Sequence, residues 1–248
     1  MNRTKLLIFS VVSLLLFNEC GSENGKKKAL SDKEKNTENT IQSSGTKDTP
    51  VEKNKEIKKE EIIEEAILLN DQNAIPFFFD YQKQNLEDKV RITTRFGNID
   101  LQLFKNTPYH RANFIYLTKK GYFNGTTFHR VVPGFIIQGG NSDRMETAKK
   151  RAEIGKYLLP PDTRKGYKHH RGVISMPSSE IENPHKLASP YEFFIVQQAP
   201  GAYHLDGSYT VFGKVIAGME VVDEINKQRI DNREAPLTNV IMEVSILQ

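Results

Sequence analysis

The chain has 248 residues, a single cysteine, no tryptophan and a formal net charge of +4 at pH 7. One cysteine excludes a disulfide framework and any zinc or iron–sulfur site that needs several cysteines. The charge is uneven along the chain. Residues 1–88 hold 13 Lys/Arg and 16 Asp/Glu, a net of −3, whereas residues 89–248 hold 22 and 15, a net of +7. A slightly acidic N-terminal part thus precedes a basic C-terminal part.

The N-terminus has the pattern of an export signal. A short basic start, residues 2–5, precedes an apolar run at residues 6–17. A run of about 12 residues is too short for a hydrocarbon core, which needs roughly 20. A polar stretch follows at once, which favours a secretory signal over a buried core helix. We therefore expect residues 1–20 to be a signal peptide.

Cys20 directly follows this run. Its placement resembles a bacterial lipoprotein signal, in which the cysteine is lipidated and becomes the mature N-terminus, although Glu19 stands where a small residue is usual. A diacylglycerol plus an acyl chain would suffice for stable anchoring. The resemblance implies a lipid-anchored protein of a bacterial cell envelope that faces the periplasm or the cell surface. A soluble secreted or periplasmic protein is the alternative.

Two segments separate the signal from the basic part. Residues 21–56 contain almost no large apolar side chain, so we expect a disordered tether with a reach of roughly 35 Å. In residues 57–88 the composition changes. Apolar side chains recur at helical spacing over residues 56–69, and an aromatic group follows. We expect residues 57–88 to be a helical and aromatic extension that packs on the main domain.

The pattern of residues 89–248 predicts many short strands and two helices. Alternation on both sides of Gly97-Asn98 predicts a hairpin. Pro108 after Thr107, with Gly121 at the far end, predicts one helix, and apolar spacing predicts another over residues 218–228. Further strands are expected at residues 127–132, 135–138, 172–176, 193–196, 211–215 and 239–247. This pattern favours an all-β barrel or sandwich.

Four sequence blocks allow a more specific prediction than the strand pattern: residues 128–140 (FHRVVPGFIIQGG), 172–176 (GVISM), 192–195 (EFFI) and 205–215 (LDGSYTVFGKV). In this order they resemble the cyclophilin-type peptidyl-prolyl isomerases over about residues 89–248. The resemblance implies a closed eight-stranded antiparallel β-barrel capped by two helices. It also implies isomerisation of X–Pro bonds in proline-containing polypeptides without a cofactor. A barrel of this size is filled by side chains, so the site is expected on its outer face.

The reaction explains why a cation is needed. Partial double-bond character gives the C–N bond a barrier of about 18–20 kcal/mol. No bond is broken, so no nucleophile is required. Rotation localises the nitrogen lone pair, and a positioned cation that donates to that nitrogen favours the twisted state. Arginine suits this role because it stays charged and presents several donors in a fixed fork.

Carried over by motif position, the resemblance implies that Arg130 is the catalytic cation and that Gln138 holds it or binds the substrate backbone. A surface salt bridge is the alternative role for Arg130, and core packing the alternative for the aromatic residues. The implied proline pocket consists of Phe135, Ile136, Phe194, Leu205 and Tyr209. Further implied substrate contacts are His129, Pro177, Ser178, Glu192 and His204. No acid–base role is assigned to His129, and no metal ligand is expected.

The sequence departs from the family at several of these positions. Ile136 replaces Met, Pro177-Ser178 replaces Ala-Asn, and Glu192 replaces Gln, where a carboxylate could pair with Arg130 and compete with substrate. His204 stands where some members carry the Trp that determines cyclosporin binding. Residues 141–171 lack the family's Gly-rich loop and are polar and partly helical in pattern, and the segment 178–191 is longer than usual.

Three alternatives remain open. The departures leave room for a weakly active cyclophilin-like chaperone or peptide-binding module. Nucleic-acid binding by residues 149–151 and 164–171 is disfavoured because no stacking motif accompanies the charges. A metal site at His169, His170 and His185 is disfavoured because adjacent histidines in a basic loop are usually exposed. We expect a monomer that acts on exported proteins and binds no nucleic acid.

Overall fold

The computed structural model describes residues 67–178 and 184–247, all within one compact unit, Glu61–Gln248. The signal, Cys20 and the tether lie outside the described residues. So do residues 56–66 of the predicted N-terminal helix. Across the part that is described, no helix has the length and apolar character needed to cross a membrane.

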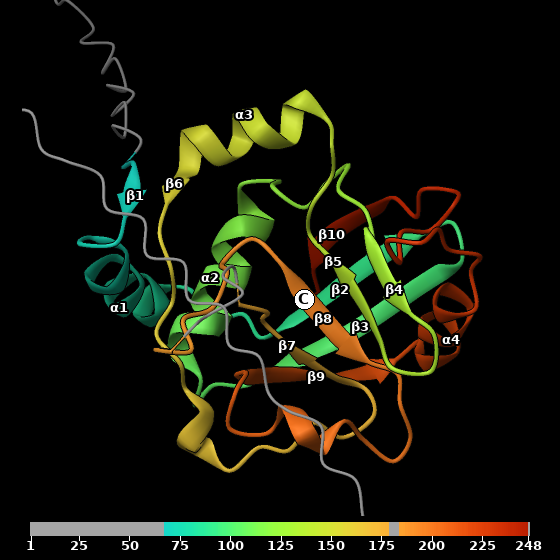
Figure 1. Ribbon diagram of the computed structural model, residues 1–248. Helices are drawn as coiled ribbons and strands as arrows, with labels where there is room; N and C mark the ends of the chain where they lie inside the picture. The colour runs from blue at the N-terminus through green and yellow to red at the C-terminus, as the bar shows by residue number, and fades with distance from the viewer. Residues whose placement is uncertain (1–66, 179–183, 248) are drawn as a thin grey trace, which may run out of the picture. The chain divides into compact units, whose positions relative to one another are not determined.

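The main sheet has eight antiparallel strands, which follow one another in the order β10-β2-β3-β9-β7-β8-β5-β4 (Figure 1). The strands are β2 (Lys89–Thr94), β3 (Gly97–Leu103), β4 (Arg130–Val132), β5 (Ile136–Gly139), β7 (Val173–Ser175), β8 (Phe193–Val196), β9 (Val211–Ala217) and β10 (Met242–Ile246). Each lies within or overlaps a segment for which the sequence predicts a strand. The hairpin of β2 and β3 turns at Gly97, whose φ of +126° favours glycine.

The closed barrel expected from the sequence is wrong, because the eight strands form an open half-barrel. In the part that the structure describes, β4 and β10 end the strand order and no ladder joins them. Thr127, which precedes β4, forms an isolated bridge with Ile241. The three residues of β4 pair with β5 instead. Three backbone hydrogen bonds join residues 125–128, which precede β4, to Val240 and Met242.

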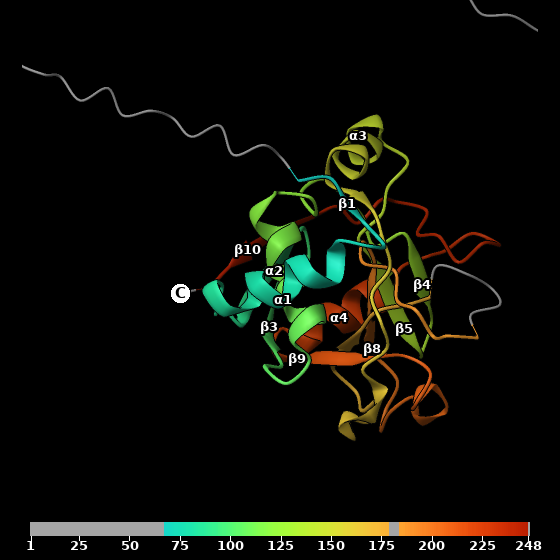
Figure 2. The same ribbon diagram turned by 90° about the vertical axis from the view of Figure 1, so that its left-hand side faces the viewer.

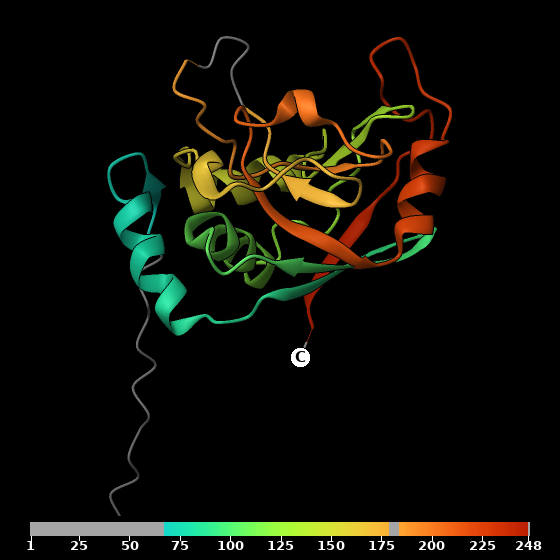
Figure 3. The same ribbon diagram turned by 90° about the horizontal axis from the view of Figure 1, so that it is seen from below.

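Four α-helices accompany the sheet within the described ranges, rather than the two expected caps. The two predicted helices are α2 (Pro108–Lys119), which packs on β9 and β10, and α4 (Met219–Asn226), which packs on β3, β4 and β5. The others are α1 (Ala74–Gln84) in the N-terminal extension and α3 (Met145–Ile154) in the segment 141–171. Seen from below, α1 and α4 flank opposite sides of the sheet (Figure 3).

Helix α2 begins as the sequence predicts, with Pro108 at its first position and Thr107 as the N-cap residue. The Thr107 hydroxyl donates to the Phe104 carbonyl at 3.1 Å instead of accepting from a helix amide. Residues 110–118 are all buried, including four polar ones. A capping helix usually exposes one face. Here α1 lies beside α2 and covers it (Figure 2).

Helix α1 is held on α2 by aromatic and polar contacts. The rings of Phe77, Phe78 and Tyr81 surround Tyr116, with centroid separations of 5.1, 5.8 and 5.4 Å. The buried guanidinium of Arg111 donates to three carbonyl oxygens at the end of α1 and just beyond it, at 2.7–3.2 Å. One of these acceptors, the Gln82 carbonyl, lies in the last turn of α1, where helix carbonyl groups lack intrahelical partners.

The extension also contacts the 141–171 segment. Strand β1 (Leu69–Asn70) pairs in parallel with β6 (Gly155–Lys156). A Cβ at Gly155 would lie 1.9 Å from the Leu69 carbonyl oxygen, so this pairing requires glycine. The helix predicted to end at Leu69 is wrong at that end, because Leu69 begins β1. A turn follows, in which Asn70 accepts bonds from the amides of Gln72 and Asn73.

Candidate functional site

The five residues of the predicted proline pocket lie together in a small hydrophobic cluster that is separate from the main core. Ile136 and Phe194 are buried, whereas the other three, which we call its rim, are only partly buried. The ring of Tyr209 meets Phe194 edge-on at 5.8 Å. We call this group of Phe135, Ile136, Phe194, Leu205 and Tyr209 the apolar pocket.

The alternation of β5 and β8 creates this pocket. Ile137 and Phe193 belong to the main core, while their neighbours Ile136 and Phe194 belong to the smaller cluster. Successive side chains of a strand point to opposite faces. Two strands that pair with each other thus supply the core with one face and the pocket with the other.

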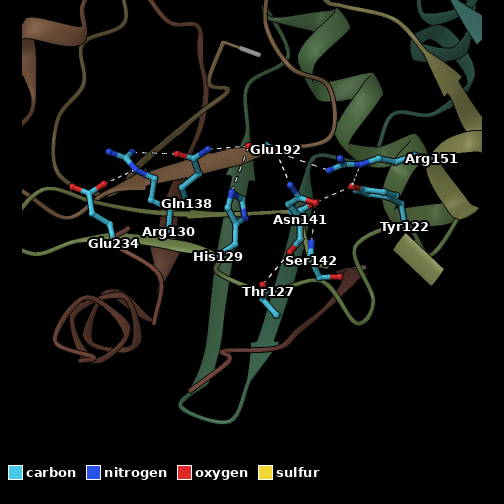
Figure 4. Close-up of polar contacts among 11 residues, drawn as sticks. Tyr122, Thr127, His129, Arg130, Gln138, Asn141, Ser142, Arg151, Glu192 and Glu234 are labelled. Atoms are coloured by element: carbon cyan, nitrogen blue, oxygen red, sulfur yellow. Dashed lines mark hydrogen bonds and ion pairs between the residues drawn. The ribbon is translucent and has the colours of Figure 1, made fainter. Parts of the chain in front are cut away.

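Arg130 stands on β4 directly opposite Gln138 on β5. Its Nη1 donates to Gln138 Oε1 at 3.3 Å, and its Nε donates to Glu234 Oε2 at 2.7 Å (Figure 4). Gln138 is the partner that the family resemblance implies for Arg130, and the geometry brings the two together. Glu234 lies outside the four blocks, and no local signal in the sequence points to it.

The Glu192 carboxylate lies on the other side of Gln138. It accepts from Gln138 Nε2 at 2.9 Å and from Asn141 Nδ2 at 3.2 Å, and its Oε2 lies 3.5 Å from His129 Nε2. Burial raises the pKa of Glu192, but the bonds from His129 and Gln138 and the charge of Arg151 outweigh it, so the pKa lies below its usual value. Glu192 is therefore an anion at neutral pH.

The possible pairing of Glu192 with Arg130 is not observed among the described contacts. The arginine that does lie beside the Glu192 carboxylate is Arg151 of α3, whose Nη2 is 3.9 Å from Oε1. Arg151 is itself held by the Tyr122 hydroxyl, to which its Nε donates at 2.8 Å. Figure 4 shows the resulting row of polar side chains from Glu234 to Tyr122. The segment that departs from the family thus supplies a counter-charge to Glu192.

The remaining predicted contacts lie around this arrangement. The exposed ring of His204 stacks on Phe135 at a centroid distance of 5.2 Å. Pro177 and Ser178 follow β7 and belong to neither the apolar pocket nor the polar row. Pro177 is buried, and its carbonyl accepts from the Ser189 amide at 2.8 Å.

The expectation of exposed histidines is wrong for His169. It is fully buried, its Nδ1 lies 2.9 Å from Asp206 Oδ1, and its ring stacks on Phe194 at 6.1 Å. Burial lowers the pKa of His169, while the Asp206 carboxylate opposes that shift. His170 and His185 are exposed. The described residues contain no group of three or more His, Cys, Asp or Glu placed to hold a metal ion.

The basic segments weighed for nucleic-acid binding contain side chains engaged within the protein. Lys150 Nζ donates to the Gly121 carbonyl at 2.6 Å, and Arg151 is bound to Tyr122. Arg171 Nη2 donates to both carboxylate oxygens of Asp223 at 2.7 Å. These three cations therefore already have partners within the protein.

Comparison with known proteins places this geometry in a family. The model for "Cyclophilin type peptidyl-prolyl cis-trans isomerase/CLD" matches residues 89–246. "Peptidyl-prolyl cis-trans isomerase-like 2" of Rhizopus delemar is 39% identical over 160 residues, which are 64% of this chain and 28% of that protein. "Peptidyl-prolyl cis-trans isomerase A" of Dickeya dadantii is 36% identical over 169 residues, which are 64% of this chain and 81% of that protein. The chain thus spans less than a third of the Rhizopus relative.

A solved structure agrees with these sequence relatives. The cyclophilin type isomerase of Cryptosporidium parvum gives a TM-score of 0.55 at 28% identity, over 65% of this chain and 98% of that chain. Its structure in the presence of the dipeptide Ala-Pro gives a TM-score of 0.54 at 29% identity, over 64% of this chain and 99% of that chain. The family predicted from the four blocks is confirmed. The chain belongs to the cyclophilin-type peptidyl-prolyl cis-trans isomerases.

Proposed function

We propose that residues 89–247 isomerise X–Pro bonds, with the proline ring in the apolar pocket and Arg130 as the catalytic residue. One observation carries this proposal. Arg130 and Val132 are two residues apart on β4, as are Gln138 and Ile136 on β5, so each pair shares one face of its strand. Val132 and Ile136 belong to the apolar cluster. The cation and the pocket therefore lie on the same face of the sheet.

The contacts of Arg130 fit this role. Its Nε is bonded to Glu234 and its Nη1 to Gln138. Within the described residues, Nη2 has no partner, which leaves a donor for the prolyl nitrogen. Because the lone pair of that nitrogen is localised only when the amide twists, such a bond is stronger in the transition state than in the planar ground state. The rotation needs no proton transfer and no covalent intermediate.

The proposed substrates are proline-containing segments of exported proteins. The Ala-Pro dipeptide in the Cryptosporidium parvum structure supports a proline-containing ligand for this fold. The export pattern of residues 1–20 and the position of Cys20 support a lipid-anchored monomer of a bacterial cell envelope. The weakly active binding module remains the second candidate, because Glu192 and Pro177-Ser178 replace the family's usual residues.

The test is the rate of cis-to-trans conversion of an Ala-Pro tetrapeptide. Replacing Arg130 by Ala is expected to lower kcat/KM about 100-fold, the scale seen when a group that stabilises the transition state is removed. Arg144→Ala, which alters an exposed arginine paired with Glu146, is the charge-matched control and keeps the wild-type rate. Equal rates for wild type and Arg130→Ala at the uncatalysed level would refute catalysis. Peptide binding by such an inactive protein would support the binding module.

The anchor has its own test. Mass spectrometry of the mature protein is expected to find Cys20 as the first residue, carrying the mass of its acyl groups. A mature chain that retains an unmodified Cys20 as an internal residue refutes lipidation and leaves catalysis untouched.

A further inference from the structure

Glu234 is a partner of Arg130 that no sequence motif predicts. The two residues are 104 positions apart, yet Arg130 Nε and Glu234 Oε2 are separated by only 2.7 Å. Glu234 lies in the loop between α4 and β10, and its backbone carbonyl accepts from the amide of Val131 at 2.8 Å. Val131 follows Arg130 on β4, so this bond fixes the loop to the strand that carries the cation.

The loop holds Glu234 in an unfavourable backbone conformation. Its φ is +64°, and Lys186 is the only other non-glycine residue with positive φ in the described ranges. Asp231 closes the turn, because its Oδ1 accepts from the amides of Arg233 and Ala235 at 2.8 and 2.9 Å. A left-handed conformation at a residue other than glycine is strained and persists only where the surroundings impose it.

Stability alone does not account for this construction. Both side chains of the pair are 39% exposed, and an ion pair exposed to solvent contributes little or nothing to stability. That gain does not exceed the strain at Glu234. The two bonds do restrict the orientation of the guanidinium group. With Nε bonded to Glu234 and Nη1 to Gln138, the planar group is held on two sides, and its Nη2 direction is fixed.

We propose that Glu234 is a positioning residue, which orients Arg130 toward the prolyl nitrogen without contacting the substrate. This inference rests on the proposed isomerase function. It predicts that catalysis depends more on the oxygen of residue 234 that accepts from Arg130 Nε than on the negative charge of Glu234. The opposite view is that the carboxylate withdraws Arg130 from the substrate, in which case its removal would accelerate the reaction.

The experiment uses the full chain and three single variants. Glu234→Ala is expected to lower kcat/KM about tenfold, because a poorly oriented catalytic group loses much of its effect. Glu234→Gln, whose amide oxygen still accepts from Nε, is expected to stay within about threefold of wild type. Glu224→Ala, which removes an exposed carboxylate paired with Lys227 on α4, is the control and keeps the wild-type rate. The melting temperatures of all variants are measured alongside.

A double-mutant cycle separates positioning from a structural role. In an Arg130→Ala background, Glu234→Ala is expected to lower the rate no further, since the group to be oriented is gone. An equal loss in both backgrounds overturns the inference, as does a Glu234→Ala rate at or above wild type. If the wild type itself fails to exceed the uncatalysed rate, the proposed function fails and the inference falls with it. An active wild type with an unchanged Glu234→Ala overturns the inference alone.

Discussion

Phe193 and Phe194 are neighbours on β8, yet they belong to two different parts of the molecule. Phe193 is fully buried and meets the rings of Phe114, Phe123 and Phe128 edge-on at 5.6–5.9 Å. Phe194 is a buried member of the apolar pocket, whose rim is only partly buried. Phe193 and its neighbours in the main core are thus shielded from water, while the pocket leaves apolar surface in contact with water.

Under the proposed function, one pair of strands therefore contributes both to the stability of the fold and to substrate binding. Burying a large apolar side chain stabilises the fold by about 1.5–3 kcal/mol. The rim side chains of the pocket contribute less than this, because part of their apolar surface stays in water. A bound proline ring would bury that surface. We therefore expect substitutions in the main core to act on the free energy of unfolding, and substitutions at the pocket rim to act on catalysis.

The largest effect is expected for Phe193→Ala. Removing the ring leaves a cavity in a closed aromatic core, so the free energy of unfolding should fall by about 3–5 kcal/mol, measured by urea denaturation. Phe194→Ala is the matched control. It should destabilise less, because the space that it opens borders a partly exposed pocket. Equal losses for the two variants would abolish the distinction between core and pocket.

A smaller effect concerns His110, a polar residue of α2 inside the main core. It is 0% exposed, and neither ring nitrogen has a partner among the described residues. Burial lowers the pKa of His110 from 6.5 to about 3. Because the folded-state pKa lies below the unfolded value, the stability that neutral His110 preserves is fully present above about pH 6.5 and is lost as pH falls toward 3.

This linkage makes the free energy of unfolding depend measurably on pH. Between pH 7 and pH 5 the wild type should lose ~2 kcal/mol of stability through His110 alone. His110→Leu should lose that much less over the same interval, since it has no group to protonate. Urea denaturation of both proteins at the two pH values measures the difference. Identical pH dependence in wild type and variant would show that His110 does not carry this effect.

The smallest effect on free energy is expected at the pocket rim. Phe135→Ala should lower kcat/KM about tenfold, equivalent to about 1.4 kcal/mol, because the proline ring loses a packing surface. Its free energy of unfolding should change by less than about 1 kcal/mol, since the ring is only partly buried. Phe79→Ala, which truncates a phenylalanine that is 50% exposed on α1, should change neither quantity. A Phe135→Ala variant as unstable as Phe193→Ala would show that the rim is part of the core.

Local signals in the sequence determined much of the fold. The hairpin of β2 and β3, the start of α2 at Pro108 and the start of α4 after Gly218 each depend on a few consecutive residues. Backbone conformation at glycine and proline is restricted or permitted locally, so these elements follow from short patterns. The family resemblance of the four blocks also implied Gln138 as a partner of Arg130 and the members of the apolar pocket, and the register of β4 and β5 in the structure places Arg130 opposite Gln138.

Only the tertiary structure decided the rest, which depends on segments far apart in the chain. The open edge between β4 and β10, the pairing of β1 with β6 and the burial of His169 against Asp206 have no local signature. Neither has the choice of carboxylates, in which Glu234 pairs with Arg130 and Glu192 with His129 and Arg151. The sequence alone does not indicate which of several acidic residues pairs with each cation. Chain packing selects the one whose backbone can be held within bonding distance.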